Sequence, residues 1–268
     1  MSAANFTTCA YCPRLCRHVC PVAVATGAES ATASAMMAVP LLTERGALSP
    51  ADALAGTSLC LGCGACTAHC KLHIPVAERL AAWRAPHVVP PAPEALAPIE
   101  GNGAVVCVLT GASDWSGGWG EAAGIAVAVL RTPDSLGHAA WRLGNLDVIP
   151  AVAAHLAGRE IVTGSGAVEE VAQAAGIRVR RLPAPAGDVV FHTCHAGPRP
   201  GPGQLACCGR REGFPEREPD AARQVAEENV RLLGGAPTSC ADEECARWLR
   251  AHGARILGPT DSPGRADD

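Results

Sequence analysis

Cysteine is the residue type that could do chemistry in this chain, with 14 among 268 residues. Thirteen fall into three groups, and only Cys107 stands alone. The groups are Cys9, Cys12, Cys16 and Cys20; Cys60, Cys63, Cys66 and Cys70; and Cys194, Cys207, Cys208, Cys240 and Cys245. Residues 1–8 carry no basic residue and no apolar run of a secretory signal, so we expect a reducing, cytoplasmic location. In such a compartment we expect closely spaced thiols to be metal ligands or redox groups rather than disulfides.

The second group, Cys60 to Cys70, has the C-x2-C-x2-C-x3-C spacing of bacterial ferredoxins. In that pattern three thiolates wrap one face of an iron–sulfur cube, and the fourth points to a second cube. Gly62 and Gly64 permit a tight backbone, and their N–H groups can hydrogen-bond to cluster sulfurs. The alternative is a zinc site, but zinc ribbons present two C-x2-C knuckles rather than four cysteines in so short a segment. The spacing therefore predicts a [4Fe–4S] cluster.

The first group is similar, with one extra residue between its second and third cysteines and with Pro21 after the fourth. In ferredoxins with two clusters, the fourth cysteine of each group binds the cluster of the other group. The resemblance implies two [4Fe–4S] clusters, with these ligands: Cys9, Cys12, Cys16 and Cys70 for cluster 1, and Cys60, Cys63, Cys66 and Cys20 for cluster 2. Because exchanged ligands tie the two segments together, we expect this domain not to fold without metal. Lys71 departs from the pattern, since a proline is expected there.

Basic side chains lie close in sequence to these cysteines: Arg14, Arg17, His18, His69, Lys71 and His73. They could offset the charge of a cluster or steer a docking partner. The alternative is a solvated basic face with no special role. We do not expect His69 to be a ligand, because four cysteines already satisfy each cube.

The third group of cysteines lies at or near the ends of predicted strands and in the adjacent turns. The carboxyl ends of strands in an α/β sheet converge on one crevice. Five thiolates gathered there would repel one another, so we predict that this group holds a third iron–sulfur cluster or zinc. The alternative is a degenerate site with buried, free thiols. His192 and His195 flank the group, and we expect them to support the ligands rather than to bind metal.

Together these motifs resemble the iron–sulfur subunits of the heterodisulfide reductase, glycolate oxidase and anaerobic glycerol-3-phosphate dehydrogenase group. Such subunits have a dicluster ferredoxin domain followed by cysteine-rich "CCG" domains of pattern Cys…Cys-Cys-Gly…Cys-x-x-Cys. The resemblance implies a non-cubane cluster or zinc in the CCG domain, and electron transfer between a flavoprotein partner and a quinone, disulfide or membrane component. The chain departs from the pattern in three places: four residues separate Cys240 from Cys245, the segment between Cys194 and Cys207 is short, and the first CCG copy keeps only Cys107.

We therefore expect an electron-transfer subunit of an oxidoreductase complex, with no catalytic residues of its own. Any flavin chemistry belongs to a partner, because no segment of this chain binds a flavin recognisably. One alternative is a catalytic subunit that reduces a disulfide at the third cysteine group. The other is a ferredoxin fused to a docking domain that zinc stabilises.

Composition along the chain predicts an α+β protein of two domains. Residues 1–85 are rich in alanine and predicted to be mostly helical, 86–101 form a Pro-rich linker, and 261–268 form a disordered tail. Residues 102–260 alternate short β-branched runs with helical stretches, which predicts an α/β domain with a largely parallel sheet. Segments 22–37 and 50–55 are Ala-rich with small polar breaks, and the predicted helices are 76–83, 148–157, 167–175, 219–233 and 243–252. The predicted strands are 104–109, 124–130, 160–163, 177–182, 188–192 and 255–257.

The second domain also carries a weak internal repeat. Ala104–Thr110 resembles Asp188–Cys194, and Glu169-Glu-Val-Ala172 resembles Glu243-Glu-Cys-Ala246, which places Val171 where Cys245 stands. The first copy is therefore predicted to be degenerate. Gly164-Ser-Gly166 opens a helix after a strand, where an anion could sit, but we expect only a turn.

Composition excludes several other functions. A net charge of −4 and 3% aromatic residues give no basis for binding nucleic acid. No run approaches the roughly 20 apolar residues of a membrane-spanning helix. We therefore expect any association with a membrane to come through a partner.

Overall fold

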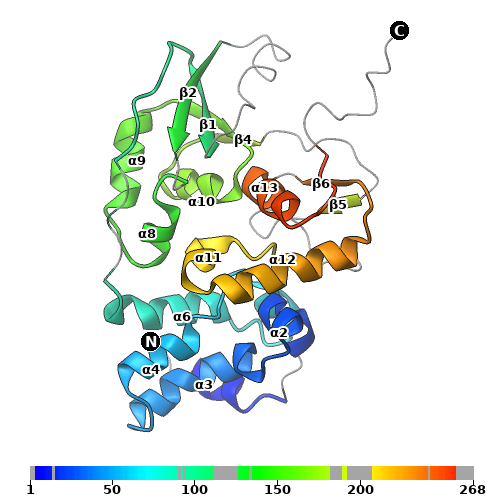
Figure 1. Ribbon diagram of the computed structural model, residues 1–268. Coiled ribbons are helices and arrows are strands. Elements are labelled where there is room, and N and C mark those ends of the chain that lie inside the picture. Colours follow the sequence, from blue (N-terminus) through cyan, green and yellow to red (C-terminus); the bar gives the residue numbers. More distant parts are fainter. Residues whose placement is uncertain are drawn as a thin grey trace. The chain divides into compact units, whose positions relative to one another are not determined.

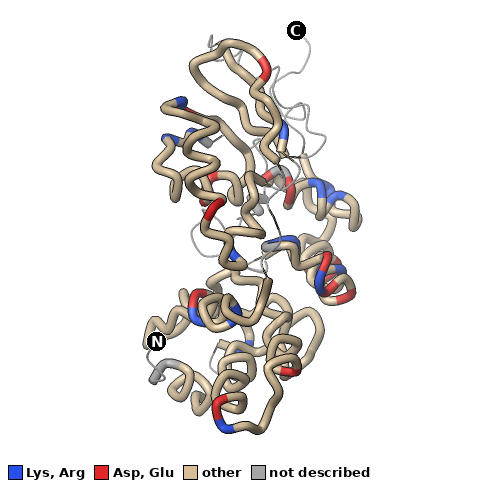
Figure 2. The backbone as a smooth tube through the Cα atoms, turned by 90° about the vertical axis from the view of Figure 1, so that its left-hand side faces the viewer, with Lys and Arg blue, Asp and Glu red and all other residues tan. Residues whose placement is uncertain are grey.

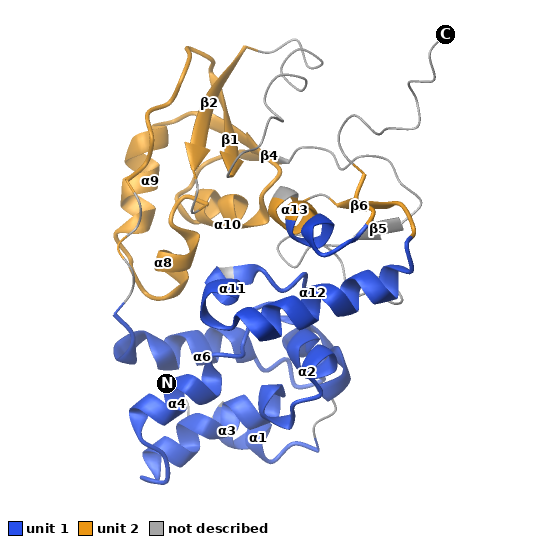
Figure 3. Cartoon of the chain, in the orientation of Figure 1, with its two compact units in different colours: residues 1–89, 197–235, 248–254 blue, residues 90–196, 236–247, 255–268 orange. Residues whose placement is uncertain are grey.

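A computed structural model of the chain describes residues 4–13, 16–89, 92, 95–110, 126–132, 135–181, 189–191, 207–240 and 242–257 (Figure 1). The chain forms two compact units, each built from segments far apart in sequence (Figure 3). Unit 1 holds residues 1–89, 197–235 and 248–254, and unit 2 holds 90–196, 236–247 and 255–268. The first change of unit falls within the predicted linker 86–101, whereas segments 197–235 and 248–254 are grouped with the first part of the chain. The predicted tail 261–268 lies outside the described residues.

Unit 1 is helical, as predicted. Its helices are α1 (Ala4–Ala10), α2 (Pro21–Thr26), α3 (Ala33–Glu44), α4 (Pro50–Thr57), α5 (Ala65–His69), α6 (Val76–Arg84), α11 (Phe214–Arg217) and α12 (Pro219–Leu233), together with the 3₁₀ turns η1 (Arg17–Val19), η2 (Glu29–Ala31), η3 (Ala85–His87) and η4 (Arg211–Gly213). The Ala-rich segment 22–37 contains most of α2, the turn η2 and the start of α3. Gly27, at a φ of +66°, ends α2 in the left-handed conformation, and Thr32 begins α3 by accepting a hydrogen bond from the Ala35 N–H.

The core of unit 1 places cysteines beside large apolar side chains. Met37 and Leu80 are fully buried, and Cys9 and Cys60 belong to the same buried cluster. Helix α1 packs on α3, and α12 packs on α2, the helix that follows Cys20. At the start of α12, the Glu218 carboxylate accepts a hydrogen bond from Ser58, which lies two residues before Cys60.

Unit 2 contains parallel strands, as predicted. Its elements are β1 (Val105–Thr110), β2 (Val127–Thr132), β3 (Glu160–Thr163), β4 (Val179–Arg181), β5 (Val189–Phe191), β6 (Thr238–Cys240), α8 (His138–Arg142), α9 (Val148–Leu156), α10 (Gly166–Ala174) and the first half of α13 (Glu243–Ala251). One sheet has the order β2-β1-β3-β4, and β5 pairs with β6 in a second sheet. All these pairs are parallel. The strand predicted over 255–257 is only a bridge from Ile256 to Thr238, and β6 was not predicted.

Strand β1 is buried along its whole length. Val106 and Val108 contact one apolar cluster, while Cys107 contacts another together with Leu109 and Val162. This alternation is that of a central strand covered on both faces. It supports the interpretation of Cys107 as a small core residue.

The repeat within unit 2 is visible in its strand pairing. Strand β3 lies between β1 and β4, and β6 lies between β5 and the Ile256 bridge. Ser165 begins α10 by accepting the Val168 N–H, as Asp242 begins α13 by accepting the Cys245 N–H. The helix starts therefore align Val168, rather than Val171, with Cys245. The sequence alignment differs from this one because it matched the pair Glu169-Glu170 with the pair Glu243-Glu244, whereas the residues that cap the two helices are Ser165 and Asp242.

Among the described residues, no helix combines the length and the apolar character needed to cross a membrane.

Candidate metal centres

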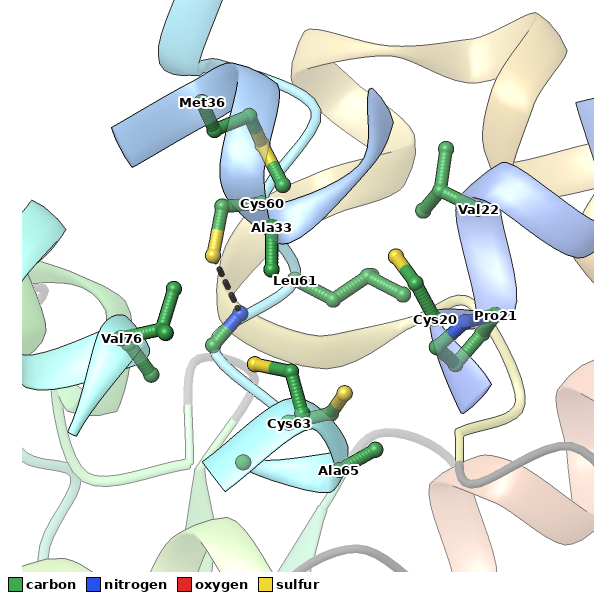
Figure 4. Close-up of a pocket in the computed structure, with 14 residues that line it drawn as sticks. Cys20, Pro21, Val22, Ala33, Met36, Cys60, Leu61, Cys63, Ala65 and Val76 are labelled. Atoms are coloured by element: carbon green, nitrogen blue, oxygen red, sulfur yellow. Dashed lines mark hydrogen bonds between the residues drawn. The ribbon is translucent and has the colours of Figure 1, made fainter. Parts of the chain in front are cut away.

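The four cysteines predicted to hold cluster 2 line one cavity in unit 1. Cys20, Cys60, Cys63 and Cys66 surround an empty volume of about 360 Å³, which includes space open to solvent. Figure 4 shows that Cys20 comes from the chain before α2, whereas Cys60 and Cys63 come from the segment before α5. Apart from the thiols, the lining is apolar: Pro21, Val22, Ala33, Met36, Leu61, Ala65, Val76 and Ala77, with Gly62 and Gly64. A cavity with four thiols and apolar walls fits the donor set of a [4Fe–4S] cluster.

Two glycines shape this cavity. Gly62 and Gly64 have φ angles of +67° and +71°, where a side chain would be strained. The Gly62 N–H donates to the Cys60 Sγ at 3.4 Å, as the sequence predicted for this type of loop. Gly64 begins α5, which carries Cys66. The glycines therefore let a short segment turn three thiols toward one space, and one of them also donates to a sulfur.

The four cysteines predicted to hold cluster 1 lie within electrostatic range of one another. Burial raises the pKa of the Cys9 thiol to about 12, and the charges of Cys16, Cys12 and Cys70 add to this rise. Burial likewise raises the pKa of Cys16, with further contributions from Cys12 and Cys70. Cys70 belongs to the second cysteine group in sequence, yet it acts on two thiols of the first. Cys70 therefore affects the thiols of Cys9 and Cys16, while the assignment of these four residues as ligands of cluster 1 stays a prediction.

The thiol of Cys20 is affected by cysteines of both groups. Burial, with the charges of Cys60 and Cys16, raises its pKa to about 11, although hydrogen bonds from the Ala23 and Val22 N–H groups oppose the rise. Burial also raises the pKa of Cys66, followed by the charges of Cys60, Cys20 and Cys16. Because these thiols favour the protonated form, metal binding must displace their protons. Cys16 acts on thiols of both predicted sites, so the two sites are close together in unit 1.

Within the described ranges, no set of three or more His, Cys, Asp or Glu residues converges as ligands of a single metal ion.

The basic residues near the cysteines differ in their surroundings. Arg17 forms an ion pair with Glu29, and both side chains are about half exposed. The rings of His18 and His69 meet edge to face, with centroids 4.6 Å apart. Lys71 and His73 are exposed. Arg14 lies outside the described residues.

The third cysteine group is divided between the units. Cys207 and Cys208 are buried in unit 1, and Cys240 and Cys245 are buried in unit 2. Cys194, His192 and His195 lie outside the described residues. A third centre built from the whole group therefore stays a prediction.

The Cys207–Gly209 loop is held against α12. Gly209 has a φ of +96°, and its N–H donates to the Cys207 Sγ at 3.4 Å, which is the arrangement seen at Cys60 and Gly62. The Asn229 side chain donates to the Cys207 carbonyl at 3.0 Å, and the Trp248 indole donates to the Cys208 carbonyl at 3.0 Å. Asn229 and Trp248 were not predicted from the sequence, because nothing near the cysteines in sequence indicates them.

A buried carboxylate holds the Cys240–Cys245 segment in unit 2. One oxygen of Asp242 accepts the Gly166 N–H at 2.7 Å, and the other accepts the Cys245 N–H at 2.9 Å. The Cys240 thiol donates to the Asp242 carbonyl at 3.2 Å. The Asp242 carboxylate therefore lies at the start of α10, next to the Gly164-Ser-Gly166 segment, where an anion is favourable. Its place at the end of a strand and before a helix is the signal that could have identified it.

Comparison with known families agrees with the chemistry of the first two groups. Residues 5–74, about a quarter of the chain, match the model of the 4Fe-4S dicluster domain. The match includes all eight cysteines of these groups, and it supports a ferredoxin-like domain with iron–sulfur clusters as cofactors. Comparison with curated proteins and with solved structures gave no match.

Proposed function

We propose that this protein transfers single electrons through two [4Fe–4S] clusters. Cluster 1 is held by Cys9, Cys12, Cys16 and Cys70, and cluster 2 by Cys60, Cys63, Cys66 and Cys20. The observation that carries the proposal is the cavity whose only thiols are the four of cluster 2, one of them from the other cysteine group. The effects of Cys12 and Cys70 on the pKa values of Cys9 and Cys16 support the assignment of cluster 1.

Bound [4Fe–4S] clusters supply one-electron redox chemistry. The chain contributes thiolate ligands, burial and hydrogen bonds, which together set the potential at which that chemistry occurs. Met36 and Val76 help to exclude water from the cavity of cluster 2. The Gly62 N–H donates to a ligand sulfur, and such donors stabilise the more negative, reduced state.

We further propose that the protein works as a subunit of an oxidoreductase complex, with a flavoprotein dehydrogenase as its partner. The support is the resemblance of the cysteine pattern to the heterodisulfide reductase and glycolate oxidase group. The acceptor in such a complex would be a quinone, a disulfide or another redox protein.

A reductive titration of the reconstituted full chain tests the proposal. The protein is assembled with iron and sulfide under anaerobic conditions and reduced stepwise, and its EPR signal and visible absorbance are recorded. We expect reversible uptake of about two electrons per chain, one for each cluster. A chain that binds iron but takes up no electrons reversibly would contradict electron transfer as its function.

A second candidate function concerns the third cysteine group, as a metal centre or as a site that reduces a disulfide. It is favoured by the Gly209 N–H on the Cys207 Sγ, since the same type of contact occurs at a predicted cluster ligand. In a Cys207→Ala variant this function predicts loss of disulfide reduction or of bound zinc, while both cubane EPR signals remain. Unchanged metal content and turnover in that variant would leave only the two-cluster function.

A further inference from the structure

The two cluster-binding segments lack carboxylates altogether. Residues 1–28 and 53–77 contain no Asp or Glu, although the chain has 26 of them. Figure 2 marks the acidic residues in red and the basic residues in blue along the described backbone. The same segments contain Arg14, Arg17 and Lys71, and Lys71 is the only lysine of the chain. Glu29, directly after the first segment, pairs with Arg17, so among the described residues of these segments Lys71 is the cation for which the structure shows no carboxylate partner.

Two large apolar side chains are exposed next to the ligands of cluster 1. Tyr11, between Cys9 and Cys12, has an exposed fraction of 72%, and Leu72, two residues after Cys70, has one of 66%. The rings of His18 and His69 are in edge-to-face contact, so the first cysteine segment and the segment that carries Leu72 meet beside Cys70. Exposed apolar side chains beside a redox centre are typical of a surface that another protein covers.

Polar groups adjoin these two side chains. Lys71 is exposed, and no carboxylate in the described part of the chain pairs with it. His18 and His69 are exposed and contact each other through their rings. We refer to Tyr11, His18, His69, Lys71 and Leu72 as the cluster 1 face. It combines an apolar pair with positive or neutral polar groups, which is the composition of a protein interface with a charged rim.

The surroundings of cluster 2 are different. Val22 and Leu61, which line its cavity, are buried, and α2 is packed against α12. Among the described residues, the large apolar side chains within two positions of a cluster 1 ligand include the exposed Tyr11 and Leu72, whereas none within two positions of a cluster 2 ligand is exposed.

We propose that the cluster 1 face is the docking surface for a redox protein that presents carboxylates, and that electrons enter or leave the chain through cluster 1. The proposal rests on the two-cluster function above. Charge complementarity carries the choice of partner. Among the described residues no carboxylate pairs with Lys71, and neither cluster-binding segment contains an acidic residue that would repel a carboxylate-rich face. The apolar pair supplies the area that is desolvated in the complex.

Two redox proteins of opposite charge can test this docking surface. Plastocyanin, with an acidic face, and cytochrome c, with a basic one, each accept one electron from the reduced, fully reconstituted chain. We expect plastocyanin to react faster at low ionic strength and to slow as salt is added. Lys71→Glu should slow plastocyanin several-fold and leave cytochrome c as fast or faster. Leu72→Ser should slow plastocyanin at every salt concentration, because it removes apolar contact.

The matched control is Arg45→Glu, which makes the same change of charge on an exposed residue after α3, at the opposite end of that helix from Met36. It should leave both rates unchanged. Carbodiimide coupling gives a readout that does not depend on rate: plastocyanin should be joined through Lys71, and Lys71→Arg should abolish the product while keeping the electron-transfer rate.

Iron content and EPR of every variant are measured first. If the wild-type chain binds no clusters, the two-cluster function fails. If clusters are intact but Lys71→Glu and Leu72→Ser leave plastocyanin reduction unchanged, the docking surface is overturned. If Lys71→Glu shifts the reduction potential of cluster 1 and slows electron transfer to both proteins equally, the docking surface is also overturned, because Lys71 would then only offset the charge of the cluster.

Discussion

Replacing Gly209 by alanine should destabilise the packing of α12 on the Cys207–Gly209 loop by about 2–5 kcal/mol. Gly209 has a φ of +96°, and a non-glycine residue in this region costs about 1–2 kcal/mol. The added Cβ would also stand 2.8 Å from the Ala222 carbonyl oxygen and 3.1 Å from the Val225 Cβ. The carbonyl belongs to the α12 backbone and cannot move without the helix, and overpacking of this kind costs about 1–3 kcal/mol.

The assay is urea unfolding of the reconstituted protein under anaerobic conditions, followed by far-ultraviolet circular dichroism. Gly234→Ala is the matched control, because Gly234 ends α12 with a φ of +60° but has open space where a Cβ would be added. It should cost only the backbone strain, about 1 kcal/mol. If Gly209→Ala lowers the free energy of unfolding no more than Gly234→Ala does, the close approach of the loop to α12 is refuted.

Three further outcomes follow from the sites. Cys20→Ala should lower bound iron from about 8 to about 4 Fe per chain, because cluster 2 loses a ligand while cluster 1 keeps four. The control variant Cys107→Ala should keep all of its iron. Equal loss of iron from both variants would contradict the ligand exchange. Burial raises the pKa of Cys20 to about 11 and that of Cys9 to about 12, so both thiols are protonated at neutral pH. Because iron must displace these protons, the apparent affinity for iron in anaerobic reconstitution should fall as pH is lowered from 9 to 6. An affinity that does not change with pH would contradict this. Asp242→Ala should lower the free energy of unfolding by about 2–4 kcal/mol, because it leaves the buried N–H groups of Gly166 and Cys245 unpaired. Ser165→Ala, which removes one cap, should lower it by only about 1 kcal/mol. Equal urea midpoints for the two variants would contradict the role of Asp242 at both helix starts.

The sequence predicted those elements whose signal is local. The helix predicted over 219–233 has the bounds of α12, and its start at Pro219 and end before Gly234 follow known preferences for helix termini. In the Ala-rich segment 22–37 composition indicated helical structure but did not locate the break at Gly27, which ends α2. Strand β6 has only three residues, Thr238–Cys240, which are too few for a periodic pattern.

The candidate sites likewise combine features that local sequence predicts with features that only the folded chain brings together. The spacing of eight cysteines predicted two sites and an exchange of fourth ligands. The four thiols predicted for cluster 2 line one cavity, while the ligand exchange stays a prediction. Sequence could not predict the supports of the third group. Asn229 is 22 positions from Cys207 and Trp248 is 40 from Cys208, so only the folded chain brings these donors to their carbonyls. The assignment of segment 197–235 to unit 1 likewise depends on tertiary packing, including that of α12 on α2.

The metal and sulfide content of the full chain, purified and reconstituted under anaerobic conditions, tests the central claim most directly. Two [4Fe–4S] clusters predict about 8 Fe and about 8 sulfide ions per chain, and about half of each in a Cys63→Ala variant that spares cluster 1. A content near 4 Fe in the wild-type chain, or stoichiometric zinc with no sulfide, would contradict the claim.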